Sequence, residues 1–271
     1  MYYLTFLDQL HRRLEPRTYL EIGIRNGDSL ALCRRRGIGV DPDFSVTTGQ
    51  PGEISLIRST SDEYFASIQE ASVTPFPGMP VDMAFIDGMH LVEFALRDFI
   101  NVERYSSDTS LIVFDDILPT DHEMASRDRH TQAWTGDVFK ILDVLAITRP
   151  DLTLLRVNTQ PTGLLLVCGL CTDDTALSRD IDLICAEQMT PDPQRVPDDI
   201  LTRHRALDPE IALALPLWDL LRSSRAVPHP DLNARVRLAS GGGPWLRGEV
   251  ELPAASAGIV SSGSDEHLHR P

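Results

Sequence analysis

Short apolar runs alternate with longer amphipathic stretches along the first 170 residues of this 271-residue chain. An apolar run of four to six residues is typical of a strand buried on both faces, whereas leucines at helical spacing indicate an amphipathic helix. The predicted strands are 19–22, one ending at 39–41, 54–57, 81–86 and 111–114. The predicted helices are 1–14, one directly after residue 28, 60–68, 90–105 and 134–147.

Two further apolar runs, 152–157 and 164–170, flank the turn Gln160-Pro161-Thr162-Gly163. Such a pair is typical of an antiparallel hairpin. Strands that alternate with helices and end in a hairpin predict an α/β fold of the Rossmann-like, doubly wound type. We expect a mostly parallel seven-stranded sheet with a C-terminal antiparallel hairpin.

The pattern divides the chain into four parts, namely an N-terminal helix (1–16), a core (17–171), a helical extension (172–226) and a tail (227–271). In the extension, the helix that carries Leu213, Leu217 and Leu221 can pack on the sheet or on a second subunit. A homo-oligomer is therefore one possible assembly. Pro, Gly, Ser and His dominate the tail without periodicity, which predicts disorder.

Charge and composition narrow the class of partner. Lys and Arg total 25 against 40 Asp and Glu, which gives a net charge of −15. This surplus argues against a nucleic-acid or anionic membrane surface, because phosphates require clustered bases. There is no apolar stretch of about 20 residues and no signal peptide, and four cysteines suggest reduced thiols. We predict a cytoplasmic protein, with the pair Cys168 and Cys171 in the core.

The stretch from Thr18 to Asp41 carries the first candidate site. Gly23 and Gly27 bracket a turn after the first strand, where missing Cβ atoms let a ligand approach the backbone. Asp28 or Ser29 can cap the following helix, and Asp41 ends the second strand with a carboxylate suited to ribose hydroxyls. We interpret this as a nucleoside-binding half-site. The alternative is an ordinary tight turn, and the G-x-G-x-x-G spacing of dinucleotide sites is missing.

Three acids follow the fourth and fifth strands, namely Asp87, Asp115 and Asp116. Ligands bind at this edge of an open α/β sheet, and converging carboxylates repel one another unless a cation joins them. Magnesium, manganese or calcium would suit oxygen ligands. The alternative is that the acids only begin a turn and cap a helix.

His90 lies three residues after Asp87. A histidine beside a cation can take a proton from a substrate hydroxyl near neutral pH. A surface histidine in a first helical turn is the alternative. If His90 is only a surface residue, His122 or His130 in the long polar loop 117–131 becomes the candidate base. A loop of this length is typical of a lid or of disorder.

Three segments carry a resemblance to a known family: FIDGMHLVEFALRD (85–98), LIVFDDI (111–117) and WTGDVFK (134–140). Together with the spacing Glu21-x-Gly23-x-x-x-Gly27, they resemble the class I S-adenosylmethionine-dependent methyltransferases, and within these the macrocin O-methyltransferase and cephalosporin hydroxylase-like group. The resemblance covers roughly residues 19–170. It implies a divalent cation, magnesium first, held by Asp87, Asp115 and Asp116, with His90 as general base.

The same resemblance implies the cofactor contacts. The residues expected around S-adenosylmethionine are Glu21, Gly23, Gly27 and Ser29 for the methionine part, Asp41 for the ribose, Ser59 and Thr60 for the adenine, and Asp87. Trp134, Asp137 and Lys140 either line the acceptor side or serve helix packing. Val92 stands where the nearer group commonly has an aromatic residue.

We therefore predict an O-methyltransferase that moves a methyl group from S-adenosylmethionine to a hydroxyl of a small molecule or sugar. One alternative is a hydroxylase-like enzyme or a nicotinamide oxidoreductase on the same scaffold. Another is a non-catalytic S-adenosylmethionine-binding protein.

Overall fold

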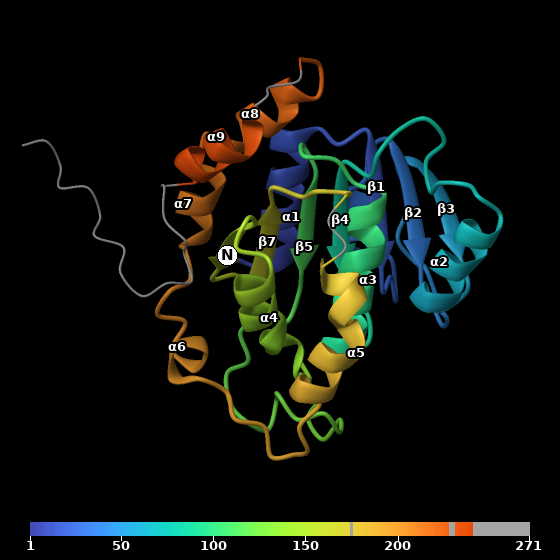
Figure 1. The fold of residues 1–271 in the computed structure, drawn as a ribbon. Coiled ribbons are helices and arrows are strands. Elements are labelled where there is room, and N and C mark those ends of the chain that lie inside the picture. The colour runs from blue at the N-terminus through green and yellow to red at the C-terminus, as the bar shows by residue number, and fades with distance from the viewer. Residues whose placement is uncertain (174–175, 228–230, 241–271) are drawn as a thin grey trace, which may run out of the picture.

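A computed structural model describes residues 1–173, 176–227 and 231–240. Its centre is one seven-stranded sheet in the order β3-β2-β1-β4-β5-β7-β6 (Figure 1). The strands are β1 (Thr18–Ile22), β2 (Arg36–Val40), β3 (Glu53–Ile57), β4 (Met83–Ile86), β5 (Leu111–Phe114), β6 (Thr153–Val157) and β7 (Leu164–Cys168). The first five pair in parallel, and β7 runs antiparallel to both β5 and β6. The predicted fold class is confirmed.

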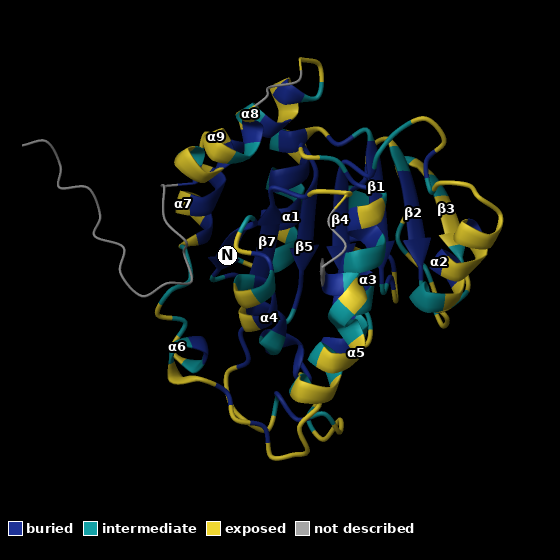
Figure 2. Ribbon diagram, in the orientation of Figure 1, coloured by how far each residue is buried: buried dark blue, intermediate teal, exposed yellow. Residues whose placement is uncertain are grey.

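Helices cover both faces of the sheet, and the strands other than the edge strand β3 are largely buried (Figure 2). The helices on one face are α2 (Ser61–Glu70), α3 (Val92–Arg104), α4 (Ile141–Thr148) and α5 (Ala176–Gln188), with the short α6 (Asp198–Leu201) beside them. Those on the other face are α1 (Tyr3–Leu14), α7 (Pro209–Leu213), α8 (Leu217–Ser224) and α9 (Leu232–Ala239). Each face therefore has its own apolar core.

The register brings the predicted site residues to one edge. Ile22 of β1 lies beside Val40 of β2 and Ile86 of β4, and Ile86 lies beside Phe114 of β5. The turns and acids that follow these strands must therefore lie along the same edge of the sheet.

The helix predicted after residue 28 is wrong. The chain forms only a three-residue 3-10 turn there, η1 (Leu30–Leu32). A five-residue strand is about 17 Å long, whereas eight helical residues return only about 12 Å, so the connection must stay partly extended. The β2–β3 connection likewise contains no helix, and its Phe44 and Val46 pack on the core of the α1 face.

Two helices begin later than predicted. Helix α3 begins at Val92, because His90 has a left-handed backbone with φ of 55°. A 3-10 turn, η2 (Val138–Lys140), precedes α4. Of the cysteine pair, Cys168 is buried as predicted, but Cys171 is exposed, which corrects that prediction.

The C-terminal extension packs on the same chain. Leu213, Leu217 and Leu221 are buried in the core beside α1, which answers the choice between the sheet and a second subunit for this helix pair. Helix α9 falls in the predicted disordered tail and corrects that prediction for residues 232–239, since Leu232 and Val236 are buried. The rest of that prediction, at 228–230 and 241–271, lies outside the described residues.

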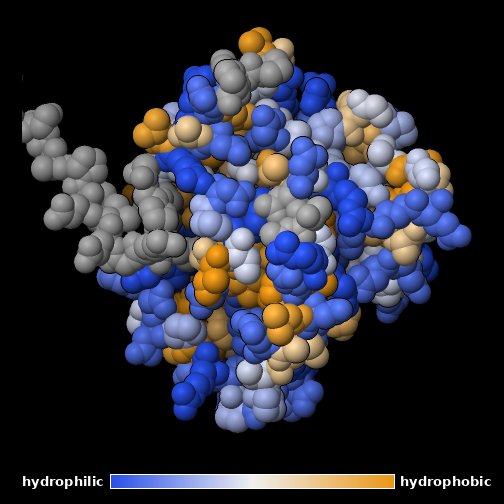
Figure 3. Space-filling model, viewed as in Figure 1, coloured by the Kyte–Doolittle hydropathy of each residue, from blue (hydrophilic) through white to orange (hydrophobic). Residues whose placement is uncertain are grey.

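The face shown in Figure 3 is largely hydrophilic, in keeping with the net charge of −15. Hydrophobic surface gathers over α4 and α5, which expose Ile147 and Leu183. None of the helices in the described part of the chain is long and apolar enough to cross a membrane.

Candidate functional site

The turn after β1 touches the turn after β4. Gly23 has a φ of +83°, and a Cβ atom there would overlap the carbonyl oxygen of Asp87. The backbone N–H of Asp87 donates to the carbonyl of Ile22 at 2.9 Å. Only glycine fits this approach, so the predicted nucleoside turn and the predicted acidic site share one backbone junction.

Asp41 organises the loops around this turn. Its Oδ2 accepts the backbone N–H groups of Ile24 and Arg25, each at 2.9 Å, and its Oδ1 accepts that of Asp43 at 2.7 Å. A carboxylate has about four acceptor positions, so these contacts leave room for a further donor. The predicted ribose contact of Asp41 stays a prediction.

Glu21 supports the turn from inside the protein. It is fully buried, and its two oxygens accept the hydroxyls of Ser29 at 2.6 Å and Tyr19 at 2.7 Å. Burial raises the pKa of Glu21 to about 8, although both hydrogen bonds oppose the rise. Glu21 and Ser29 therefore satisfy each other, and their predicted cofactor contacts stay predictions.

Gly27 faces protein rather than open space. A Cβ atom there would lie 2.9 Å from Cγ1 of Val46 in the β2–β3 connection. After β3, Thr60 forms a capping box with Glu63 at the start of α2, as the helix prediction required, and Ser59 precedes it. The structure thus places Ser59 and Thr60 at the ligand edge, with the Thr60 hydroxyl engaged by the helix.

The acidic group centres on His90. Its Nε2 lies 3.2 Å from Oδ1 of Asp87, and its Nδ1 lies 2.6 Å from Oδ2 of Asp116. These three side chains bring candidate ligand atoms within 4.8 Å of one another. Asp115 lines the same pocket, and its Oδ1 accepts the backbone N–H of Asp116 at 2.8 Å. The described residues therefore offer two carboxylates and an imidazole, and the ligand role predicted for Asp115 stays a prediction.

Burial and the neighbouring charges shift the pKa values of the acids and the histidine in this group. Burial raises the pKa of Asp87, and the charge of Asp116 adds to this effect while the hydrogen bond from His90 opposes it. Burial also raises the pKa of Asp115 well above its usual value, with Asp116 and Asp87 adding to it. Burial would lower the pKa of His90, but hydrogen bonds to Asp116 and Asp87 outweigh it and raise that pKa well above its usual value.

This donor set fits a divalent cation. The carboxylate oxygens of Asp87 and Asp116 are ligands that magnesium and manganese accept, with water filling the remaining positions, and His90 lies beside them. The group also lines a small pocket together with Ala95, Asp98 and Val138. A cation here would relieve the repulsion between Asp87 and Asp116.

Asp98 is a site residue that the sequence analysis missed. It is 2% exposed, and its Oδ1 has no hydrogen-bond partner within the described part of the chain. Burial raises its pKa to about 7, although a hydrogen bond from Ser61 opposes the rise. The available signal was an acid on the apolar face of the predicted helix 90–105, between Leu96 and Phe99.

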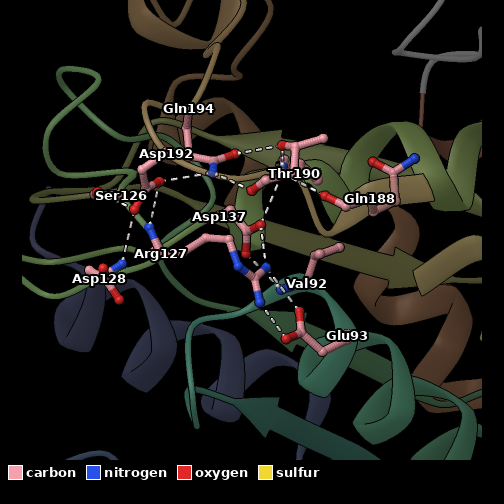
Figure 4. Close-up of polar contacts among 12 residues, drawn as sticks. Val92, Glu93, Ser126, Arg127, Asp128, Asp137, Gln188, Thr190, Asp192 and Gln194 are labelled. Atoms are coloured by element: carbon pink, nitrogen blue, oxygen red, sulfur yellow. Dashed lines mark hydrogen bonds and ion pairs between the residues drawn. The ribbon is translucent and has the colours of Figure 1, made fainter. Parts of the chain in front are cut away.

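Of the three residues predicted after the long loop, one lies at the site. The indole of Trp134 stacks on the imidazole of His90, with 5.3 Å between ring centroids and 6° between planes. Asp137 is fully buried and accepts the backbone N–H of Val92 at 3.0 Å (Figure 4). The side chain of Lys140 donates to Asp137 at 3.0 Å. Asp137 and Lys140 therefore serve packing, which was the alternative interpretation.

The substitute histidines lie away from the acids. His122 accepts the backbone N–H of Val196 through Nδ1 at 3.3 Å. His130 belongs to an exposed group with Asp128 and Asp192. Neither is part of the group formed by Asp87, His90 and Asp116.

Residues 20–117 match the family model described as a methyltransferase domain. The predicted resemblance to the class I methyltransferases is confirmed for this stretch, whereas the macrocin-like group stays a prediction. No curated protein sequence matches the chain.

Solved structures with a similar fold include three O-methyltransferases. One is TomG from Streptomyces achromogenes, with 20% identity, 62% of this chain and 80% of that chain covered, and a TM-score of 0.48. Another, from Klebsiella pneumoniae and described as putative, has 18% identity, 62% and 80% coverage and a TM-score of 0.45. A third, from Bacillus cereus, has 15% identity, 61% and 80% coverage and a TM-score of 0.43.

Proposed function

We propose that this protein is a cation-assisted methyltransferase that moves a methyl group from S-adenosylmethionine to a hydroxyl of a small molecule or sugar. One observation carries the proposal. The group Asp87, His90 and Asp116 lies at the strand edge that also holds the Gly23–Asp41 turn. Both lie in the stretch that matches a methyltransferase domain.

The proposed roles follow from placement. The turn from Gly23 and the carboxylate of Asp41 would hold the cofactor, and Asp87, Asp116 and His90 would face the acceptor. A divalent cation, when bound, would lower the pKa of the acceptor hydroxyl and orient it. Because a sulfonium is a good leaving group, holding the reactants in line supplies much of the rate.

The hydrogen bonds of His90 suggest which nitrogen accepts the proton. Nδ1 lies beside two acceptors, Oδ2 of Asp116 at 2.6 Å and the carbonyl oxygen of Trp134 at 3.1 Å, so it carries a hydrogen. Nε2 has the longer contact, 3.2 Å to Asp87. We therefore assign the proton-accepting role to Nε2, with Asp116 holding the ring. A divalent cation bound to the carboxylates would lower the raised pKa of His90 and so free this nitrogen to act as a base.

The test measures S-adenosylhomocysteine formed with a panel of hydroxyl acceptors. Exhaustive chelation should abolish turnover, and magnesium or manganese should restore it. Asp116→Asn should prevent this restoration, whereas the matched control Asp108→Asn, an exposed acid in the turn before β5, should not.

Two outcomes would contradict the proposal. Full turnover after chelation would mean that the reaction needs no cation. Tighter binding of NAD than of S-adenosylhomocysteine would overturn the cofactor assignment. Binding of S-adenosylhomocysteine without turnover on any acceptor would favour the non-catalytic alternative.

A further inference from the structure

The loop segment 134–136 packs directly against His90. The left-handed backbone of His90 fits against Gly136, where a Cβ atom would overlap the His90 carbonyl oxygen. The Trp134 ring covers the imidazole, and the Trp134 carbonyl contacts Nδ1 at 3.1 Å. The orientation of His90 therefore depends on where this segment lies.

The segment is in turn fixed to an earlier part of the same loop. Nε1 of Trp134 donates to the carbonyl of Ser126 at 2.6 Å. The backbone N–H of Thr135 donates to the carbonyl of Met124 at 3.0 Å. Residues 124–126 thus hold residues 134–135 in place through hydrogen bonds.

Arg127 fastens this loop to the protein (Figure 4). Its guanidinium donates to both carboxylate oxygens of Glu93 at 2.5 and 3.1 Å and to Oδ2 of Asp137 at 2.7 Å. The Arg127 side chain is 18% exposed, and that of Asp137 is fully buried. Because Glu93 lies in the first turn of α3, the loop is tied to the helix that follows His90.

The connection between α5 and α6 holds the loop from outside. Asp192 accepts the Ser126 hydroxyl at 2.7 Å and the backbone N–H groups of Arg127 at 3.0 Å and Asp128 at 3.2 Å. Gln194, which is 3% exposed, also donates to Asp192, at 2.9 Å. One carboxylate thus accepts hydrogen bonds from three consecutive residues of the loop and satisfies their hydroxyl and backbone donors.

We propose that Asp192 and Arg127 are positioning residues for His90, and that the helical extension completes the candidate active site through the α5–α6 connection. They act through the chain of contacts from Asp192 to Ser126, Trp134 and His90. The proposal rests on the proposed function for its catalytic meaning, but the positioning itself does not depend on it. Residue 192 lies well outside the stretch that matches a methyltransferase domain, 20–117.

The direct test measures how fast diethyl pyrocarbonate modifies each histidine of the full-length protein, with peptide mass spectrometry as the readout. Asp192→Ala should raise the rate at His90 about 5- to 10-fold, since its loop cover opens more often. Two other histidines serve as internal references: the exposed His204 reports reagent activity, and the buried His11 reports global unfolding. Neither rate should change.

Two variants sharpen the result. Asp180→Ala removes a half-exposed, arginine-paired carboxylate from α5 without touching the loop, so its His90 rate should equal that of the wild type. Trp134→Phe keeps a ring on the imidazole and should change the rate less than Trp134→Ala. If Asp192→Ala proves too unstable to measure, Ser126→Ala removes a single donor to the same carboxylate.

An unchanged His90 rate in Asp192→Ala, or a rise shared equally with His11, would overturn the proposal. Binding of S-adenosylhomocysteine should stay within about 2-fold of the wild type, because the Gly23–Asp41 turn is not touched. Failure of S-adenosylhomocysteine to bind the wild type would count against the proposed function alone, since the histidine rates are measured without it.

Discussion

The two halves of the ligand edge are built in opposite ways. On the nucleoside side, polar groups satisfy one another, as when Asp41 accepts three backbone N–H groups. On the acidic side, Asp87 and Asp116 face one imidazole, and both His90 and Asp116 have left-handed backbones, with φ of 55° and 62°. Left-handed backbone is common to both halves, since Arg25 in the nucleoside turn has a φ of 43°. The difference is that hydrogen bonds satisfy the carboxylate of Asp41, whereas the acidic half holds two carboxylates whose repulsion a cation can relieve.

The largest effect that would test this contrast is loss of the imidazole. His90→Asn keeps a residue that tolerates the left-handed backbone but removes the base. We expect the maximal rate to fall by about 10²- to 10⁴-fold with nearly unchanged cofactor affinity, measured as S-adenosylhomocysteine formation. His122→Ala and His130→Ala should keep normal rates. If His122→Ala or His130→Ala loses activity and His90→Asn keeps its normal rate, the base lies in the long loop.

The next effect concerns the junction between the halves. Gly23→Ala should lower the free energy of unfolding by about 2–4 kcal/mol, because its Cβ atom meets the Asp87 carbonyl and its φ is +83°. Denaturant titration measures this loss. The matched control is Gly49→Ala, where a Cβ atom meets nothing within 4 Å, and a change near zero is expected. Equal losses at both positions would mean that the two turns do not depend on each other.

A third effect is the pH dependence of stability that the buried carboxylate of Asp98 causes. Burial raises the folded-state pKa of Asp98 to about 7, above its unfolded value. The stability that Asp98 contributes is therefore full below about pH 4 and is lost as pH rises to about 7. Asp98→Asn should raise the free energy of unfolding at pH 8 by on the order of 2–3 kcal/mol, and by less at pH 5. A gain that does not depend on pH would contradict the assignment.

The smallest effect is on the nucleoside side. Asp41→Ala should weaken S-adenosylhomocysteine binding by about 1–3 kcal/mol, through lost ribose contacts and a looser turn. Titration calorimetry measures this. Asp43→Ala is the control, because its fully exposed carboxylate has only a 3.8 Å contact with Arg58. Equal weakening in both variants would mean that Asp41 acts only through general charge.

The sequence predicted the sheet because its signals were local. The buried strand 111–114 and the helix predicted over 60–68 were both correct, since apolar runs and the cap that Thr60 forms depend on near neighbours. The helix expected after residue 28 failed because its room is set by the distance between strand ends, which no local pattern records.

The membership of the candidate site was predictable only in part, since Asp98 was missed, and its arrangement was not predictable. Asp87 and Asp116 come together as the strand order requires, whereas the hydrogen bond from the Asp116 N–H to Oδ1 of Asp115 depends on the local backbone conformation. The roles of Arg127 and Asp192 depend on contacts between residues 65 positions apart, such as the Arg127 N–H donated to Asp192. Sequence spacing alone carries no information on such pairs.

The missing crossover helices have a consequence for local opening. The connections between β1 and β2 and between β2 and β3 hold only a 3-10 turn and loops, and the edge strand β3 exposes 40% of Leu56. Amide hydrogens at this end should exchange with solvent before those of the central β4 and β5. A nucleoside seated on Asp41 would hold both loops closed. Its binding energy would then appear as slower exchange along β2 and β3, beyond the residues that touch it.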